Sequence, residues 1–146
     1  MLTDSIQILQ VEDDEDDRVL FSWALKKAGI EAQVTSAVDG AECMSILETF
    51  LPEVIFLDIN MAGMNGKECL KLIRANNKFD TIPVIILTTS DHEVDITETF
   101  DSGATLYMVK PFRTEDMAKL LKRIFTDNWQ QALQQRERNS FVVKAK

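Results

Sequence analysis

Five short apolar runs alternate with longer amphipathic segments along this chain, and this alternation constrains the fold more than any other feature. The runs cover residues 6–11, 33–37, 54–57, 84–87 and 106–109. Strands that alternate with helices are typical of parallel sheets, because each strand needs a helical crossover to return to the same edge. The pattern therefore predicts an α/β fold, a doubly wound five-stranded parallel sheet with helices on both faces.

The third and fourth runs are continuously apolar, and the fifth is so from Tyr107 to Val109. Strands that are covered on both faces have this composition, so these three should form the centre of the sheet. The segment at residues 17–28 has apolar residues at helical spacing and is followed by Gly29, a common helix stop. We expect a helix there, with Phe21 and Trp23 facing the sheet.

Composition excludes several classes of protein. The chain has 146 residues, 45% of them hydrophobic, which fits one compact domain. Its formal net charge of -8 opposes binding to nucleic acids and to anionic membranes. Cys43 and Cys69 lack the close spacing of zinc or redox motifs, and no apolar run is long enough to span a membrane. We therefore expect a cytoplasmic protein whose two cysteines are small helix residues.

Polar side chains follow four of the five apolar runs. Six consecutive acids, residues 12–17, come after the first run, and Asp58, Thr88 and Lys110 follow the third, fourth and fifth. In an open parallel sheet the functional crevice forms beyond the carboxyl ends of the strands. We therefore expect several carboxylates, a hydroxyl and an ammonium group to meet at one edge of the sheet.

Such a cluster has a definite chemistry. Two carboxylates about 4 Å apart repel by roughly 4 kcal/mol at an effective dielectric constant near 20, so they take up protons or bind a cation. Mg²⁺ suits an all-oxygen site best, because it accepts a few carboxylates together with water and phosphate oxygens. With Glu12 and Asp13 on the metal side, Asp58 could act as a nucleophile toward phosphorus, while Lys110 and Thr88 stabilise the phosphoryl oxygens.

Each of these signals also has an ordinary structural interpretation. Acids at a helix start are favoured by the helix dipole, and we assign this role to the four acids at residues 14–17. Asp58 could cap the next helix, although Gly63 and Gly66 indicate that this helix begins later. Tyr107 taken alone is typical of a buried strand residue.

At these residues the sequence resembles the receiver domain of two-component response regulators, over about residues 6–125. The resemblance rests on residues 8–14 (ILQVEDD), 56–66 (FLDINMAGMNG), 86–90 (ILTTS) and 107–112 (YMVKPF). It implies the flavodoxin-like strand order 2-1-3-4-5 and a phosphorylation switch in a phosphorelay. The implied site comprises the phosphoacceptor Asp58, catalytic Thr88 and Lys110, a Mg²⁺ site of Glu12, Asp13, Asp58 and the Asn60 backbone carbonyl, and switch residues Thr88 and Tyr107.

The resemblance also implies partners. A histidine kinase or histidine phosphotransfer protein would supply the phosphoryl group, and the face made by the fourth helix, fifth strand and fifth helix would bind a downstream protein. The chain would be a signalling domain that catalyses its own phosphotransfer and slow autodephosphorylation, rather than a conventional enzyme. A cis bond between Lys110 and Pro111 is implied too. Ala62 and Thr89 depart from the family pattern, without removing a catalytic group.

Three other functions fit parts of the sequence. A haloacid dehalogenase-type phosphatase needs an Asp-x-Asp motif, and the segment 58–60 has Asn60 in the second position. A flavodoxin-like FMN carrier needs a phosphate-binding loop where this chain has six acids. A degenerate receiver that only binds partners would not need the full set of site residues.

The last twenty residues leave the organisation open. We expect a receiver domain at residues 1–126 and a helical extension or tail at 127–146, without a separate output domain. Phe125, Trp129 and Leu133 recur at four-residue spacing. One hypothesis is that the last helix continues and presents this apolar stripe to a second copy, and the alternative is packing on the domain itself. We expect the segment 141–143 to be a frayed terminus.

Overall fold

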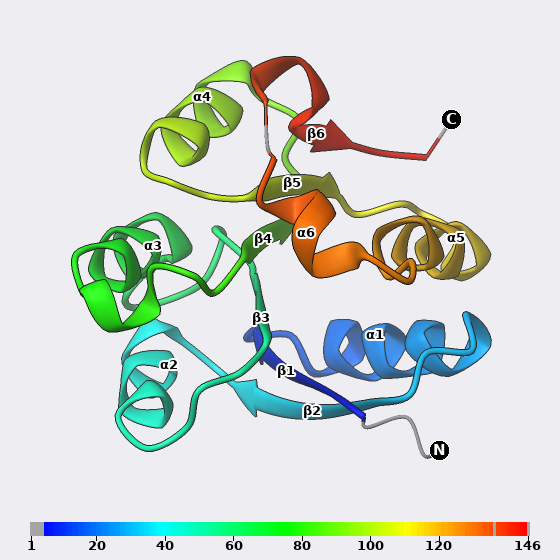
Figure 1. Ribbon diagram of the computed structural model, residues 1–146, viewed down its shortest axis with the longest axis horizontal. Coiled ribbons are helices and arrows are strands. Elements are labelled where there is room, and N and C mark those ends of the chain that lie inside the picture. Colours follow the sequence, from blue (N-terminus) through cyan, green and yellow to red (C-terminus); the bar gives the residue numbers. More distant parts are fainter. Residues whose placement is uncertain (1–4, 136, 146) are drawn as a thin grey trace.

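The computed structural model describes residues 5–135 and 137–145 and contains a parallel six-stranded sheet in the order β2-β1-β3-β4-β5-β6 (Figure 1). The predicted α/β fold and the strand order 2-1-3-4-5 are confirmed, and a sixth strand is added beyond β5. The strands are β1 (Ile6–Val11), β2 (Ala32–Ala37), β3 (Val54–Leu57), β4 (Val84–Thr88), β5 (Leu106–Val109) and β6 (Val142–Val143).

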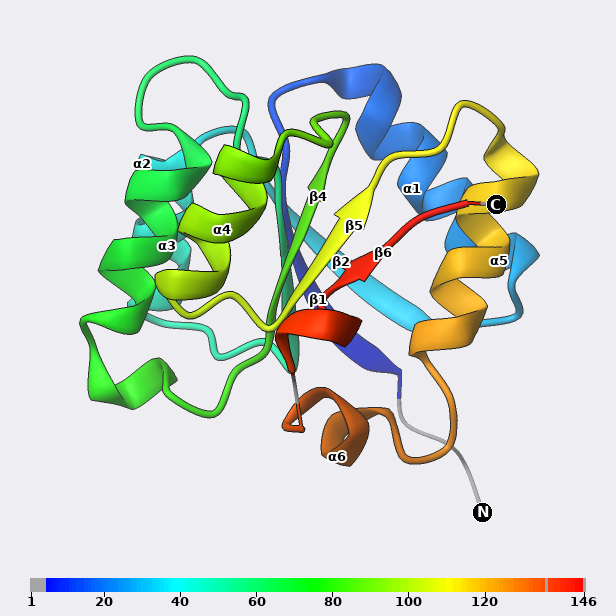
Figure 2. The same cartoon turned by 90° about the horizontal axis from the view of Figure 1, so that it is seen from above.

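Helices cover both faces of the sheet and form two outer layers (Figure 1). One layer contains α2 (Gly40–Leu47), α3 (Gly66–Arg74) and α4 (Glu93–Asp101), and the other contains α1 (Glu15–Lys27) and α5 (Thr114–Ile124). The remaining elements are η1 (Asn77–Phe79), α6 (Trp129–Leu133) and η2 (Arg138–Ser140). Because the sheet is parallel, the carboxyl ends of its strands all open at the same edge, which Figure 2 shows from a second direction.

The centre of the sheet is apolar on both faces, as the continuous runs predicted. Every residue of β3 and β4 is buried. Their side chains point alternately into two hydrophobic cores, one under α2, α3 and α4 and the other under α1 and α5. This burial holds the ends of β3 and β4, and the polar residues that follow them, in place.

Asp14 caps the start of helix α1, because its carboxylate accepts a hydrogen bond from the Asp17 amide at 2.9 Å. The helix ends before Gly29, which has a φ of 76°. Phe21 is buried and packs against Phe56 with ring centroids 4.8 Å apart and the ring planes inclined by 58°. Trp23 is exposed, so the prediction that both aromatics face the sheet is wrong. Two residues correspond to about 200° around a helix, and the two side chains therefore point to opposite sides.

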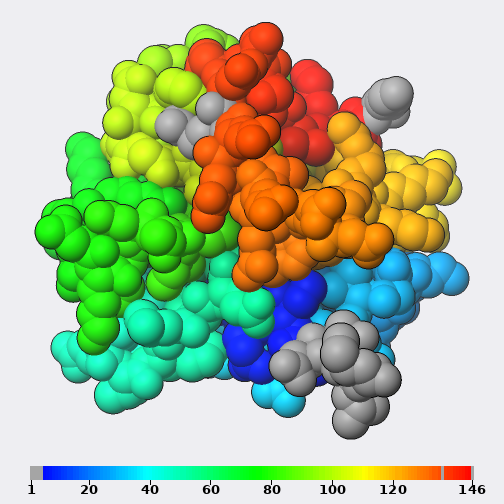
Figure 3. Space-filling view, in the orientation of Figure 1, coloured from blue at the N-terminus to red at the C-terminus, as the bar shows by residue number. Residues whose placement is uncertain are grey.

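The segment after α5 folds back on the domain. Helix α5 ends at Ile124, and the short helix α6 is separate from it, so the hypothesis of one extended helix with an exposed stripe is wrong. Trp129 and Leu133 are buried in the core under α1 and α5, and Trp129 packs edge-on against Phe125. In Figure 3 the segment that contains α6 spreads over the middle of the visible face.

The last described residues form the edge of the sheet. β6 pairs in parallel with β5, and Phe141 before it has no exposed surface. The prediction of a frayed terminus is therefore wrong, because this short run buries a phenyl ring and satisfies the edge of β5. Cys43 on α2 and Cys69 on α3 are buried and free, as predicted for small helix residues. Within residues 5–135 and 137–145, no helix has the length and hydropathy needed to cross a membrane.

Candidate functional site

The Lys110 ammonium lies at the centre of the polar cluster at the carboxyl edge of the sheet. Lys110 directly follows β5, and its Nζ donates to Glu12 Oε1 at 2.6 Å, Asp17 Oδ2 at 2.8 Å and Asp58 Oδ2 at 3.1 Å. Glu12 directly follows β1, and Asp58 directly follows β3. The predicted meeting of these three strand ends is therefore present in the structure.

Glu12 and Asp58 are buried, with 2% and 6% of their surface exposed. Burial raises the pKa of Glu12 to about 7, and the negative charge of Asp58 adds to this effect against the opposing hydrogen bond from Lys110. For Lys110, burial alone would lower the pKa, but hydrogen bonds to Asp17 and Glu12 outweigh it and raise the pKa above its usual value. The ammonium is thus charged at neutral pH, whereas Glu12 is poised to gain or lose a proton.

Three carboxylates could share a metal ion. Oxygen atoms of Glu12, Asp13 and Asp58 lie within 4.8 Å of one another, and Asp13 is exposed at the rim. An all-carboxylate donor set that is open to solvent on one side fits Mg²⁺, which keeps water or phosphate oxygens among its ligands. The donors present thus fit a hard divalent cation.

The loop after β3 is held against the cluster by backbone contacts. The Asn60 amide donates to Asp58 Oδ1 at 2.9 Å, and the Ala62 amide donates to Asp13 Oδ2 at 3.3 Å. Gly66 starts α3 directly against the backbone of Asp58: a Cβ atom there would lie 2.5 Å from Ile59 Cα. Only glycine permits this approach, so α3 fixes the end of β3.

Thr88, at the end of β4, is completely buried beside the cluster. Its Oγ1 accepts a hydrogen bond from Asn60 Nδ2 at 3.1 Å and a longer one from the Ser90 amide at 3.4 Å. The Asn60 side chain thus connects the loop after β3 to Thr88.

Tyr107 is also completely buried, and its hydroxyl donates to the Ser90 carbonyl at 2.9 Å. Burial raises the pKa of Tyr107 above its usual value. The Ser90 hydroxyl in turn donates to Asp95 on α4, and Asp95 pairs with Lys67 of α3 at 2.6 Å. One polar chain therefore runs from Tyr107 through the loop after β4 to α3 and α4.

Two further residues at the start of α1, Asp17 and Arg18, contribute contacts to the site that were not predicted from the sequence. Asp17 lies in the first turn of α1, as predicted, and its carboxylate also reaches Lys110. This contact depends on the reach of the Lys110 side chain and on the position of α1, so no local pattern in the sequence indicates it. Arg18 Nη1 donates to the Glu12 carbonyl at 2.7 Å and fixes the turn between β1 and α1.

The peptide bond between Lys110 and Pro111 is trans, since no cis peptide bond occurs among the described residues. The cis bond implied by the resemblance is therefore wrong for this structure. A trans bond is the favoured isomer even before proline, by about 0.5–1 kcal/mol. The Lys110 side chain reaches all three carboxylates with this isomer.

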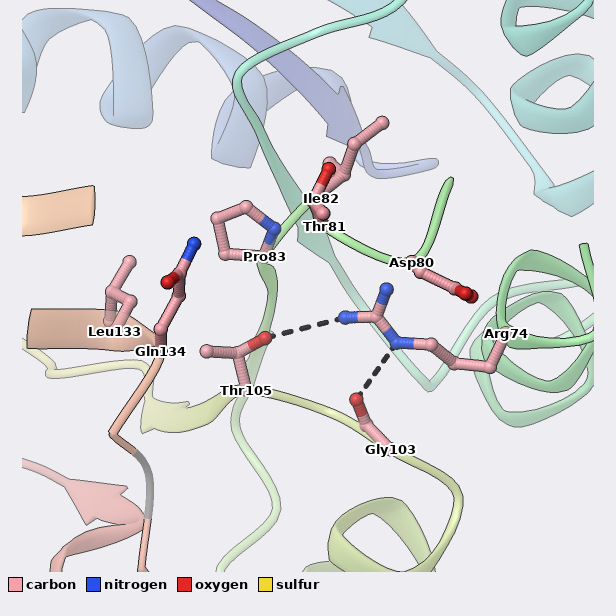
Figure 4. Close-up of a pocket in the computed structure, with 9 residues that line it drawn as sticks. All are labelled: Arg74, Asp80, Thr81, Ile82, Pro83, Gly103, Thr105, Leu133 and Gln134. Atoms are coloured by element: carbon pink, nitrogen blue, oxygen red, sulfur yellow. Dashed lines mark hydrogen bonds between the residues drawn. The ribbon is translucent and has the colours of Figure 1, made fainter. Parts of the chain in front are cut away.

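A cavity of about 330 Å³ lies at the opposite edge of the sheet, at the amino ends of β4 and β5 (Figure 4). Arg74 crosses it and donates to the Gly103 carbonyl at 2.9 Å and to the Phe79 carbonyl at 3.0 Å. These bonds tie α3 to the segments that precede β4 and β5, so Arg74 has a structural role there.

Comparison with known proteins agrees with this geometry. The family model of the response regulator receiver domain matches residues 8–122. Response regulator Rcp1 of Synechocystis sp. is 31% identical over 124 residues, which are 80% of this chain and 84% of Rcp1. The structure of Mn²⁺-bound Rcp1 superposes with a TM-score of 0.74 at 30% identity, covering 82% of this chain and 91% of that one.

A second solved structure, the chemotaxis response regulator CheY4 of Vibrio cholerae, is 32% identical, with a TM-score of 0.72 and coverage of 82% of this chain and 98% of CheY4. The chain spans about half the length of some other curated relatives that it matches. The fold and the cluster after β1, β3 and β5 define a signalling receiver of the response regulator type. The chain belongs to the response regulator receiver domain family.

Proposed function

We propose that this chain accepts a phosphoryl group on Asp58 from a phosphohistidine of a kinase or phosphotransfer protein, in the presence of Mg²⁺, and thereby switches its binding to a downstream protein. The observation that carries the proposal is the Lys110 ammonium, which lies within 3.1 Å of oxygens of Glu12, Asp17 and Asp58. A fixed cation beside a buried carboxylate is what phosphoryl transfer to that carboxylate requires.

The proposed phosphoryl transfer is a nucleophilic displacement at phosphorus. An Asp58 carboxylate oxygen forms the new bond to phosphorus, the bond from phosphorus to the donor nitrogen breaks, and the imidazole leaves with a proton from solvent. Lys110 and the hydroxyl of Thr88 would then bind phosphoryl oxygens. In the structure the Thr88 hydroxyl oxygen accepts a hydrogen bond from the Asn60 side chain, which leaves the hydroxyl proton of Thr88 to be donated to a phosphoryl oxygen.

Mg²⁺ would be held by Glu12, Asp13 and Asp58, with the Asn60 carbonyl as a further ligand. When bound, the ion neutralises negative charge on the phosphoryl group. The closeness of the three carboxylates supports this set. The raised pKa of Glu12 supports it too, since a carboxylate that is costly to ionise gains most from a cation.

Exposed apolar side chains near the cluster support a protein as the phosphodonor. Leu20 and Phe112 line a small pocket together with Glu12 and Lys110, and Trp23 lies one turn further along α1. All three are more than a third exposed, and Phe112 is fully so. Exposed aromatic residues that surround a buried charged site are typical of protein interfaces.

The proposal extends to organisation and location. Residues 1–126 would form the receiver, and residues 127–146 would be an extension packed on it, with Trp129 and Leu133 buried in the same core. Because these side chains are buried within the chain, a homodimer through them would need this segment to detach first. The buried free thiols of Cys43 and Cys69 support a reducing compartment such as the cytoplasm.

Intact-mass measurement after incubation with Mg²⁺ and a small phosphodonor tests the proposal. We expect one phosphoryl group on the wild type and on the control Asp101→Asn, an exposed acid on α4, and none on Asp58→Asn. An unmodified wild type with every donor would favour a receiver that only binds partners. Continuous hydrolysis of many phosphate esters would favour a phosphatase instead.

A further inference from the structure

The C-terminal segment, residues 137–145, lies outside the matched receiver region and occupies the free edge of β5 (Figures 1 and 2). β6 pairs with β5 in parallel, with Val142 opposite Tyr107. The Tyr107 amide donates to the Phe141 carbonyl at 2.9 Å. The segment thus completes the backbone hydrogen bonding of Tyr107, one of the predicted switch residues.

Side chains of the same segment pack on α4 and β5. The Phe141 ring meets Phe100 of α4 edge-on, with centroids 5.1 Å apart, and lies 6.0 Å from the Tyr107 ring. Arg138 forms an ion pair with Glu93 at the start of α4, and its guanidinium lies 5.9 Å from the centre of the Phe100 ring. The segment is therefore anchored both on Tyr107 and on α4.

Tyr107 connects these contacts to the phosphoacceptor site. Its hydroxyl donates to the Ser90 carbonyl, and the Ser90 amide donates to Thr88 Oγ1. The Phe141 ring packs beside the Tyr107 ring, and both side chains are completely buried. The docked C-terminal segment thus contacts the buried Tyr107 through both its backbone and its Phe141 ring.

We propose that docking of residues 137–145 is coupled to occupancy of the Asp58 site, so that phosphorylation tightens docking and docking favours phosphorylation. This coupling rests on the proposed function, in which the Thr88 hydroxyl turns toward a phosphoryl oxygen. Movement of Thr88 toward the phosphoryl group would leave space beneath it. A Tyr107 ring held in its buried position would fill that space, whereas an outward ring would leave a cavity. Because the two equilibria are thermodynamically linked, phosphorylation must favour docking of the segment by the same factor as docking favours phosphorylation.

Hydrogen exchange of the full chain tests the coupling, because the Tyr107 amide is bonded to the Phe141 carbonyl and exchanges when the segment detaches. With Mg²⁺ and beryllium fluoride, a phosphoryl mimic, we expect the protection of this amide to rise. Arg138→Glu places like charges opposite each other and should lower protection about two- to fivefold, the usual range for an exposed pair. The charge swap Arg138→Glu with Glu93→Arg should restore protection.

Two further variants complete the test. Phe141→Ala should lower Tyr107 protection at least tenfold and weaken beryllium fluoride binding, whereas the control Asn139→Ala, an exposed residue of η2, should change neither. If beryllium fluoride binds the wild type but leaves Tyr107 protection unchanged, the coupling is refuted and the proposed function stands. If it does not bind in Mg²⁺, the proposed function fails, and the coupling falls with it.

Discussion

Replacing Glu12 by glutamine should remove a loss of stability that the metal-free protein undergoes as pH rises. The pKa of Glu12 rises from 4.5 to about 7 on folding, mainly because the side chain is buried. A pKa that is higher in the folded state means that stability is greatest below about pH 4.5 and is lost as pH rises through 7. At about 1.4 kcal/mol for each pKa unit, the loss amounts to about 3 kcal/mol.

Urea unfolding in the presence of a chelator, at pH values from 5 to 8.5, measures this effect. Glutamine has the same shape and does not ionise, so we expect Glu12→Gln to approach the wild type near pH 5 and to exceed its stability by about 3 kcal/mol near pH 8. Glu15→Gln removes an exposed carboxylate in the first turn of α1 and should leave the profile close to that of the wild type.

Added Mg²⁺ should narrow the difference at pH 8, because the ion stabilises the ionised Glu12 that only the wild type has. Near pH 5 the ion should have less effect, since it must first displace a proton. A difference between wild type and Glu12→Gln that stays constant from pH 5 to 8.5 would refute this account of the cluster.

Three further predictions concern the same edge of the sheet and the C-terminal segment. Gly66→Ala should destabilise the fold by several kcal/mol in urea unfolding, because the new methyl group would meet the backbone of residues 58 and 59. In the control Gly40→Ala the methyl group would meet mainly the flexible Met64 side chain, so the loss of stability should be clearly smaller. Equal losses of stability in the two variants would contradict this prediction. Lys110→Met should lower the free energy of unfolding by about 3 kcal/mol at pH 8, because it leaves the buried carboxylates without their cation. The loss should be smaller at pH 6, where one of the carboxylates can take up a proton. Equal losses at the two pH values would count against this prediction. Trp129→Ala should lower the thermal midpoint of the protein and leave its sedimentation coefficient unchanged, since the ring is buried within the chain. A change in association state would favour the dimer hypothesis.

The centre of the sheet could be predicted from the sequence because its strands leave a strong signal. β3 and β4 are buried on both faces, so they read as uninterrupted apolar runs, and their predicted starts match the structure. The meeting of Glu12, Asp58 and Lys110 followed from topology alone, since parallel strands bring their carboxyl ends together.

Features that depend on the reach of a side chain or on the rotation of a helix about its axis could not be predicted from the sequence. The involvement of Asp17 needs the length of the Lys110 side chain and the position of α1, neither of which is a local property of the sequence. The exposure of Trp23 depends on which side of α1 faces the sheet. β6 contains only two residues, so its sequence gives a weak signal. Its pairing with β5 depends on the packing of Phe141 against Phe100, a residue that is far from Phe141 in the sequence.

Mapping the modified residue tests the account most directly. After incubation with a phosphodonor, borohydride reduces an acyl phosphate to an alcohol, and peptide mass spectrometry then locates it. We expect the alcohol produced by reduction at position 58 when Mg²⁺ is present, and little or none of this product when a chelator removes the ion. Modification at another acid of the cluster, or equal labelling of Asp58 without a divalent cation, would contradict it.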